Sequence, residues 1–432
     1  MKRFYLVLLV LCLSLVFISC DRGGSTQTQE LRFIVNVVTD MPQAVDYFRE
    51  LHPEIDVDME MIPVANIFAR YQALLAVNDL PDVMWAQSGT FLSMARAGIY
   101  ADLSQALNGM NYEGDMVWRN TFVPELLAAS RALLNPLGPE VYSRDWGVPT
   151  QMTSIAILYD KAFFDANGLR EPTNWNEFVD LNNRLVAMGR VPMSTNFANI
   201  DWFPRLFWDQ RLRPELTANP FAFEEGDLTF THPQVIQGLE DFKNLYDAGW
   251  FPSNFLTATP EQLIQAFLQG GIVQLFTVPG LMRFIYDVAP PEWSLASYVF
   301  PSITGLPPRS LGGPGGIQTI SGSSDNFDTG LILLKFLTSR TYFSQHHTRL
   351  LNSGLVNVPF DPDYTQVLSG FLQAAANGFI PDIYVPINAS PELIDSWRSD
   401  LFPNWLQGRH TTMHVATQLQ RLYEETYLVL MD

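Results

Sequence analysis

The residues best suited to chemistry in this sequence are its acidic side chains and its histidines, and their spacing outlines no catalytic centre. His410 and His414 stand one helical turn apart and could share a metal ion, but no third ligand is evident near them. His346 and His347 are adjacent, so they would point to different sides of any helix or strand. A pair of carboxylates for glycoside hydrolysis is conceivable among 45 acidic residues, although no segment singles one out.

Motifs for nucleophiles, phosphates and metals lead to the same result. The sequence contains no Gly-x-Ser-x-Gly turn, no Walker loop and no His-Glu-x-x-His motif. The run Gly312–Gly316 lacks the third spaced glycine of a dinucleotide-binding fingerprint. We therefore expect a protein that is not an enzyme and that holds no metal and no cofactor.

Polar side chains that could bind a small molecule follow two of the predicted strands. Thr39 and Asp40 follow the first strand, and Gln87 and Ser88 follow the third. A carboxylate at such a position can accept two hydroxyl groups. Two local alternatives remain open, because Asp40 could cap the helix that begins at Pro42 and Ser88 could cap the helix after it.

The elements around these residues alternate between strand and helix, which predicts an α/β fold with mostly parallel sheets and ligands beyond the carboxyl ends of the strands. The first strands are expected at Leu31–Val38, Ile55–Ile62 and Asp82–Trp85, and the first helices at Pro42–Leu51, Ile67–Val77 and Phe91–Ala97. The alternation restarts after Trp146–Pro149 with a strand at Ile155–Tyr159, helices at Trp175–Met188 and Pro233–Ala248, and a strand and helix pair at Leu263–Leu268 and Ile272–Phe276. Then come an extended connector at Ser297–Pro301, the glycine-rich run before a strand, and a helix at Asn326–Leu337.

The N-terminus has the pattern of an export signal. Met1–Arg3 is followed by an apolar run over Phe4–Ile18, which is shorter than the ~20 residues of a membrane span. Cys12 lies inside this run and Cys20 at its end, so a mature chain would have no other thiol for a disulfide. Phe17–Cys20 resembles the lipobox of bacterial lipoproteins, with Phe where Leu is commonest. We expect a signal peptide over 1–19, a lipid on Cys20 and a flexible tether over 20–30.

Length and charge limit the classes of protein. The chain has 432 residues, too many for one compact core, and suits two lobes. Its net charge of −19 argues against binding nucleic acid or an anionic membrane surface. We expect a monomer in the cell envelope, attached to the membrane only through its N-terminal lipid.

Several segments share residues, in order, with one known family. They are Phe48–Val57, Leu80–Trp85, Ala95–Leu103, Gly147–Pro149, Leu158–Lys161 and Trp175–Phe178. They resemble the extracellular solute-binding proteins of ABC transporters, in the branch that includes the maltose-binding type. The resemblance implies a two-lobed periplasmic-binding-protein fold, type II, called a Venus flytrap, whose hinged halves close on a solute. It implies one lobe over 31–148 plus 297–345 and another over 149–296 plus 346–432.

The resemblance also implies a function and a set of contacts. Family members deliver sugars and related polar solutes to an ABC-transporter permease, and the aromatic faces in such clefts stack on sugar rings. Contacts carried over from the family fall on Thr39, Asp40, Gln87, Ser88, Thr153, Asn199, Asp201, Trp202, Gly280, Gly313 and Gly315. Packing in the core is the alternative role for Trp202.

Two departures from the family pattern make the class of solute less certain than the fold. Relatives often place a sugar-stacking Trp where this chain has Gly280, and another where it has Pro314. Backbone N–H groups at Gly313 and Gly315 could still reach a ligand, because glycine allows close approach. A surface adhesin and an exported carbohydrate-active enzyme remain the alternatives to a solute receptor.

Overall fold

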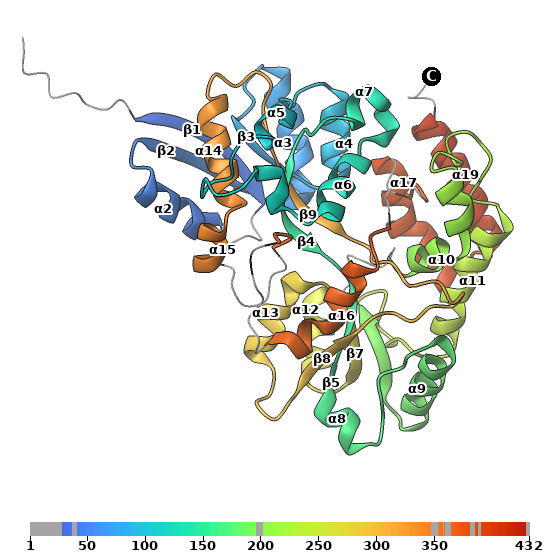
Figure 1. Cartoon of the computed structure of the whole chain (residues 1–432). Coiled ribbons are helices and arrows are strands. Elements are labelled where there is room, and N and C mark those ends of the chain that lie inside the picture. The colour runs from blue at the N-terminus through green and yellow to red at the C-terminus, as the bar shows by residue number, and fades with distance from the viewer. Residues whose placement is uncertain are drawn as a thin grey trace, which may run out of the picture.

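The protein is built around two β-sheets, each covered by its own helices, in the computed structural model drawn in Figure 1. The structure describes residues 28–36, 41–195, 202–346, 353–356, 358, 364–380, 385–387 and 390–428. We call the part packed around the five-stranded sheet the first half. The second half is the part packed around the four-stranded sheet, together with the C-terminal helices. Each half has a separate main hydrophobic core.

The sheet of the first half has the strand order β2-β1-β3-β9-β4. Its strands are β1 (Gln29–Asn36), β2 (Ile55–Ile62), β3 (Val83–Ala86), β4 (Val148–Thr153) and β9 (Gly313–Ile320). β1 pairs in parallel with β2 and β3, whereas β9 runs antiparallel to β3 and β4. In the edge strand β2, Ile55 and Val57 are buried while Asp56 and Asp58 are exposed. Charges on an edge strand oppose pairing with a second sheet.

Helices cover this sheet with amphipathic faces. They are α2 (Met41–Leu51), α3 (Val64–Ala76), α4 (Ser88–Arg96), α5 (Ser104–Leu107), α6 (Pro124–Ala132), α7 (Pro139–Tyr142), α14 (Phe327–Leu337) and α15 (Arg340–His346). α2 buries Ala44, Val45 and Phe48, which recur with helical spacing. The Phe48 ring lies 5.2 Å from the ring of Phe336, so α2 packs against α14. Short 3-10 turns at Trp118–Thr121 and Asn135–Leu137 join the other elements.

The sheet of the second half has the strand order β6-β7-β5-β8. Its strands are β5 (Ala156–Asp160), β6 (Val191–Thr195), β7 (Ile272–Thr277) and β8 (Leu295–Tyr298), with the helices α8 (Lys161–Ala166), α9 (Trp175–Ala187), α12 (Pro260–Leu268), α13 (Pro279–Val288) and α16 (Thr365–Ala376). β5 is antiparallel to β7 and β8, and β6 is parallel to β7. The Thr259 and Gln262 side chains form a capping box that begins α12.

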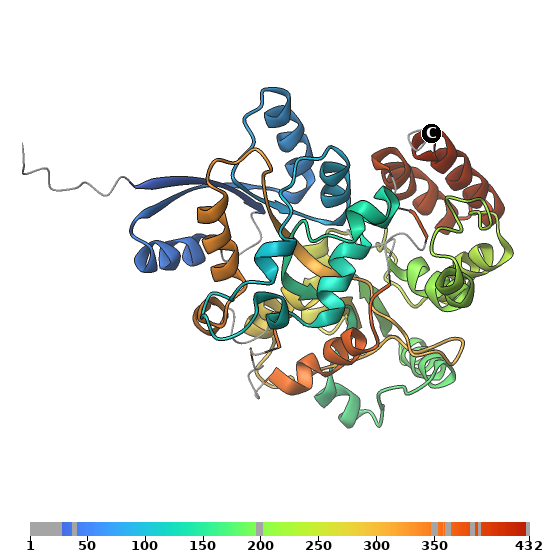
Figure 2. The same cartoon turned by 45° about the horizontal axis from the view of Figure 1, so that its top comes forward.

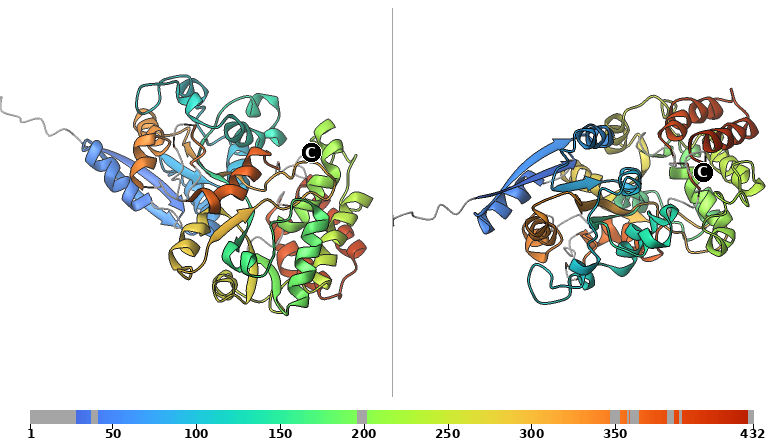
Figure 3. Two further views of the ribbon diagram at one scale, coloured as in Figure 1. Left: turned by 60° about the horizontal axis from the view of Figure 1, so that its bottom comes forward. Right: turned by 90° about the horizontal axis from the view of Figure 1, so that it is seen from above.

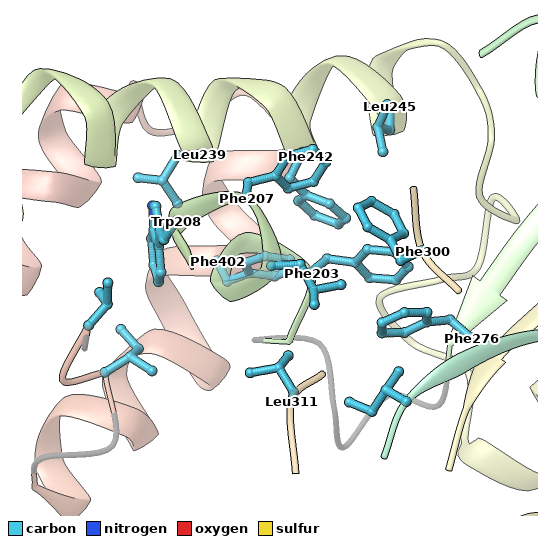
Figure 4. Packing of buried hydrophobic residues seen from close by; sticks show 14 of the residues in the cluster. Phe203, Phe207, Trp208, Leu239, Phe242, Leu245, Phe276, Phe300, Leu311 and Phe402 are labelled. Carbon is cyan, nitrogen blue, oxygen red and sulfur yellow. The ribbon is translucent and has the colours of Figure 1, made fainter. Parts of the chain in front are cut away.

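A cluster of aromatic rings fills the second half between the sheet and the remaining helices (Figure 4). These helices are α10 (Trp202–Ala218), α11 (Pro233–Asp247), α17 (Pro391–Ser396), a π-helical turn (Trp397–Leu401), α18 (Phe402–Leu406) and α19 (Thr412–Thr426). The ring of Phe203 lies 4.3 Å from Phe276 and 5.4 Å from Phe242, which stacks on Phe402 at 5.6 Å. Such pairs add about 0.5–1.5 kcal/mol each beyond the burial of their area. The cluster therefore binds the helices α10, α11 and α18 to strand β7.

The C-terminal helices lie far from the first strands of the chain. Figure 2 and Figure 3 show α17 and α19 beside α10 and α11, on the side of the molecule opposite β1 and β2. The contacts between helices agree, because α19 packs against α11, α17 and α18. The second half thus consists of a sheet and a helical layer that extends toward α4 and α7 of the first half (Figure 1).

Four sequence predictions are wrong in the structure. The sheets are mixed rather than mostly parallel, because β4, β5 and β9 run against their neighbours. The predicted connector at Ser297–Pro301 begins inside β8, and the glycines predicted to precede a strand form the start of β9. Leu263–Leu268 is helical and Ile272–Phe276 is a strand, the reverse of the predicted pair, because the short buried run resembles both states.

Candidate functional site

In the first half, the predicted site residues lie at or after strand ends that share one edge of the sheet. Ala86 at the end of β3 pairs with Ile317, and Thr153 at the end of β4 pairs with Gly313. Gln87 comes next after β3, so it leaves the sheet beside the first residues of β9. Loops after β3 and β4 and the beginning of β9 therefore share this edge.

In the second half, one edge of the sheet lies opposite this edge of the first sheet. It is held there because the link between the two sheets is very short. Ser154 and Ile155 alone separate β4 from β5. At the start of β5, Ala156 pairs with Thr277, the last residue of β7. The carboxyl ends of β6 and β7 thus lie at the edge of the sheet that faces the first half, and ligands of α/β proteins bind beyond such strand ends.

Glycines let the backbone of β9 come very close to its neighbours. Gly312 has a φ of 120°, and a Cβ there would lie 2.3 Å from the carbonyl oxygen of Thr153. A Cβ at Gly316 would lie 2.2 Å from the indole nitrogen of Trp85. Any larger residue at these two positions would displace β4 or the indole, so the glycines fix the shape of this edge.

Three hydroxyl groups at the link and the strand ends of the second half have no hydrogen-bond partner among the residues that the structure describes. They belong to Ser154, Thr195 and Thr277, whose side chains are 0%, 0% and 2% exposed. A buried polar group without a partner costs about 1–3 kcal/mol, so such groups in a native protein call for an explanation. These three hydroxyls can therefore donate and accept hydrogen bonds that no described residue makes with them.

Ser310 ties together three chain segments where the two halves join. Its hydroxyl accepts a hydrogen bond from the N–H of Ile155 at 2.7 Å. Its own N–H donates to the carbonyl of Gly378 at 2.9 Å, and its carbonyl accepts from the N–H of Ile380 at 2.8 Å. Ser310 thus bonds to the β4–β5 link and to the segment after α16, and it lies in the connector from β8 to β9.

A buried ion cluster attaches this connector to the second half. The carboxylate of Asp209 on α10 accepts hydrogen bonds from Arg213 on the same helix and from Arg309 on the connector, whose Nε lies 3.1 Å away. Beside it, Gln210 accepts a bond from the N–H of Ile303 at 2.6 Å. Charge-assisted bonds are stronger than neutral ones, so this side of the junction is held firmly to α10.

The part of the chain that the structure describes offers no metal site and no span of a bilayer. No group of three potential metal-binding side chains occurs there, and His410 and His414 contact each other with ring centroids 4.5 Å apart. Within the same residues, no helix combines the length and apolar character needed to cross a membrane. The groups named at the two strand-end edges are hydroxyls, amides and backbone N–H groups, so the edges can make neutral hydrogen bonds.

Two surface hollows lie away from these edges. One lies beside the π-helical turn and includes Arg398 and Asn404, and the other includes Leu80, Ile99 and Gly322 at the opposite end of β3. Neither contains a residue predicted to contact the ligand. The candidate site therefore rests on the chemistry of the strand ends and not on these hollows.

Comparison with known proteins identifies the chain. The model of the family of bacterial extracellular solute-binding proteins matches residues 36–339, most of the chain. The chain belongs to this family. It is also 23% identical over 202 residues to the multiple sugar-binding protein of Streptococcus mutans serotype c, a match that covers 45% of this chain and 43% of the length of that relative.

Solved structures show that this solute-binding protein has the two-lobed fold of periplasmic binding proteins. A chitin oligosaccharide binding protein matches with a TM-score of 0.73 at 16% identity, over 93% of this chain and 99% of its own. RafE of Streptococcus pneumoniae in complex with raffinose matches with a TM-score of 0.72 at 16% identity, over 92% and 99%. The sugar-binding protein MalE of Xanthomonas citri gives 0.67 at 16% identity, over 92% and 97%. The predicted fold and family are confirmed.

The structure of the solute-binding protein places some of the predicted contact residues together. Gln87, Thr153, Gly313 and Gly315 lie at or beside the edge of the first sheet. Ser88 is the first residue of α4, so Gln87 rather than Ser88 occupies the cap position. Gly280 and Trp202 lie in the first turns of α13 and α10, on the other side of the junction. The remaining predicted contacts lie outside the described residues: Thr39, Asp40, Asn199 and Asp201.

The sequence predictions favoured Thr153 over its neighbour Ser154, and they did not propose Thr195 or Thr277. Thr277 directly follows the segment Ile272–Phe276, so the end of this apolar run was a local signal for it. Ser154 stands next to the predicted contact Thr153. Thr195 ends β6, a strand of five residues that the sequence pattern did not indicate.

Proposed function

We propose that this solute-binding protein captures a neutral sugar or oligosaccharide between its two halves and delivers it to an ABC-transporter permease. The unpartnered hydroxyls of Ser154, Thr195 and Thr277 carry the proposal. A sugar hydroxyl both donates and accepts hydrogen bonds, so it suits these groups and the neutral groups on the opposite edge. The sugars in the names of the matched proteins support the same class of solute.

Further parts of the proposal concern organisation and location. We propose lobes over 31–148 plus 297–345 and over 149–296 plus 346–432, in a monomer without catalytic activity. We propose that cleavage after residue 19 leaves a lipid on Cys20, with the tether over 20–30 holding the protein at the outer face of a bacterial membrane. Labelling with a radioactive fatty acid, abolished by Cys20→Ala, would support this anchor, and labelling that survives the substitution would contradict it.

A ligand panel tests the proposed function. We would titrate the purified mature protein with raffinose, tagatose, xylo-oligosaccharides and chitin oligosaccharides, and with amino acids and spermidine for comparison. One sugar should bind with one-to-one stoichiometry, raise the unfolding temperature and remain chemically unchanged. At 100 times its dissociation constant, a ligand adds about 2.7 kcal/mol to the free energy of unfolding. Binding of spermidine or an amino acid in place of every sugar would overturn the proposal.

Variants at the edges test the location of the site. Thr277→Val and Thr153→Val keep the side-chain shape and remove one hydroxyl each. We expect each to weaken binding of the identified sugar by about tenfold, the effect of one lost hydrogen bond. Thr257→Val is the matched control, because Thr257 is exposed and belongs to none of the strand ends. Unchanged affinity in both variants would place the sugar elsewhere.

A further inference from the structure

Arg96 of the first half contacts an aromatic ring of the second half, away from the connecting strands. Its guanidinium carbon lies 5.8 Å from the centroid of the Tyr427 ring, within the range of a cation–π interaction. Phe91 and Met94, on the same helix α4, belong to the core of the first half. Tyr427 belongs to the core of the second half. The contact therefore spans the two halves.

The second half presents an aromatic and acidic receptor for this cation. The ring of Tyr427 stacks on that of Tyr423 at 5.2 Å and 20°. Burial and the nearby carboxylate of Glu224 raise the pKa of Tyr427 to about 12, while Arg96 acts in the opposite direction. The Oε2 atom of Glu224 and the hydroxyl of Tyr423 are buried without hydrogen-bond partners. An electron-rich face with an acidic neighbour favours a cation, and Arg96 supplies it.

We propose that Arg96 on the receptor formed by Tyr423, Tyr427 and Glu224 is a reversible latch between the two halves. A cation–π contact at an exposed guanidinium is weak enough to open and close. It lies away from the junction around Ser310, so it resists relative movement of the halves instead of marking the pivot. The latch stabilises the arrangement of the halves seen in this structure.

Helix α4 connects the latch to the candidate site. It begins at Ser88, directly after Gln87 at the edge of the first sheet, and ends at Arg96. Nine helical residues span about 13 Å, so a movement of the strand-end loop after β3 is carried to Arg96 by one rigid element. This coupling to a bound solute rests on the proposed function, whereas the latch itself does not.

Two other cation–π contacts provide matched controls. Arg190 lies 5.7 Å from the centroid of Phe163, and Lys335 lies 5.6 Å from that of Trp118. The first pair lies within the second half and the second pair within the first half. Their distances match that of the latch, so their loss should weaken one half without freeing the halves from each other.

Hydrogen exchange of the sugar-free protein tests the latch. We expect Arg96→Ala to speed exchange of backbone amides in both α4 and the last turns of α19 by about two- to fivefold, the factor for an exposed cation–π contact. Small-angle scattering of the same variant should show a changed radius of gyration. Arg96→Lys keeps the cation and should restore most of the protection. Arg190→Ala should leave both helices and the radius of gyration unchanged.

The outcomes separate the latch from the proposed function. If Arg96→Ala has the same exchange and radius of gyration as Arg190→Ala, the latch is wrong. Faster exchange confined to the last residues around Tyr427, with an unchanged radius of gyration, would also overturn the latch. It would show that Arg96 only packs locally against the C-terminal residues. A protein that binds no sugar but opens in Arg96→Ala would refute the proposed function and leave the latch standing.

Discussion

Each sheet buries one glutamine on a central strand, and the two glutamines differ in their hydrogen bonds. Gln274 on β7 donates to Asn182 at 2.8 Å and to the carbonyl of Pro192 at 3.1 Å, and it accepts a bond from the hydroxyl of Tyr298. Gln318 on β9 is equally buried, yet within the described residues neither its amide nitrogen nor its amide oxygen has a partner. The buried glutamine of the second sheet is therefore fully bonded, whereas that of the first sheet is not.

This difference in hydrogen bonding indicates which part of each sheet is rigid and which part is free to rearrange. A fully bonded polar network inside a protein rigidifies its surroundings, because every member loses a bond when it moves. Gln318 pairs across the sheet with Trp85 and Val148, one residue inside the end of β3. The unpartnered amide of Gln318 thus lies next to the candidate binding edge of the first sheet, while the bonded network around Gln274 lies inside the second sheet, three residues before the strand end at Thr277.

The largest expected loss of stability comes from breaking the ion cluster that attaches the β8–β9 connector to the second half. Asp209→Asn removes the carboxylate charge that two partly buried arginines share, and removing one member of a buried pair costs about 3–5 kcal/mol. Urea unfolding of the variant and the parent measures this loss. Asp247→Asn is the control in the same half, because its pair with Lys243 is exposed and worth about 0–1 kcal/mol. Equal losses in the two variants would contradict the role of the cluster.

Breaking the hydrogen-bond network around Gln274 should cause the next largest loss of stability. Gln274→Leu keeps the volume of the side chain but leaves Asn182 and the Tyr298 hydroxyl without their buried partner. We expect a loss of about 1–3 kcal/mol in the free energy of unfolding. Asn182 keeps its bond to the carbonyl of Phe178 at 2.7 Å, which limits the loss. An unchanged stability would show that the network does not hold the second sheet.

The matching substitution in the other sheet should act in the opposite direction. Gln318→Leu removes a buried amide that bonds to nothing, and its apolar replacement packs beside Trp85 and Ile320. We expect a gain of about 1–2 kcal/mol, because the desolvation cost of the amide disappears. The comparison of Gln274→Leu with Gln318→Leu in one denaturation series tests the contrast between the sheets directly. A loss at Gln318 would mean that a bound water or solute satisfies the amide.

The fold was predictable from local patterns where these patterns were long or strongly alternating. The strand predicted at Ile55–Ile62 has the observed bounds of β2, because its acidic and apolar residues alternate between solvent and core. Val191–Thr195 was missed because four successive buried residues show no alternation. Ser297–Pro301 failed for another reason, since the pairing of β8 with β5 joins residues about 140 apart in the chain.

The site was predictable only in part for the same physical reason. Gln87 and Ser88 follow an apolar run, so a local pattern indicates that they leave a strand. The nearness of Ser154 to Thr277 depends on β5 pairing with β7, which no local pattern encodes. The absence of hydrogen-bond partners at these hydroxyls is likewise a property of the packed interior. Sequence reasoning therefore found the strand ends of the first half and missed the hydroxyls facing them.

The smallest expected effect concerns Glu224 beneath the proposed latch and depends on pH. Burial first, and then the charge of Glu225, raise the pKa of the Glu224 carboxyl above its usual value, so the folded protein binds a proton that the unfolded chain has released. Stability from this group is fully present below the usual glutamate pKa of about 4.3 and is lost as the pH rises through the raised value. Glu224→Gln should therefore be more stable than the parent at pH 7, and the difference should shrink toward pH 4. Thermal unfolding across this range measures it, with the exposed Glu215→Gln as control, and a difference independent of pH would show that folding does not raise the pKa of Glu224.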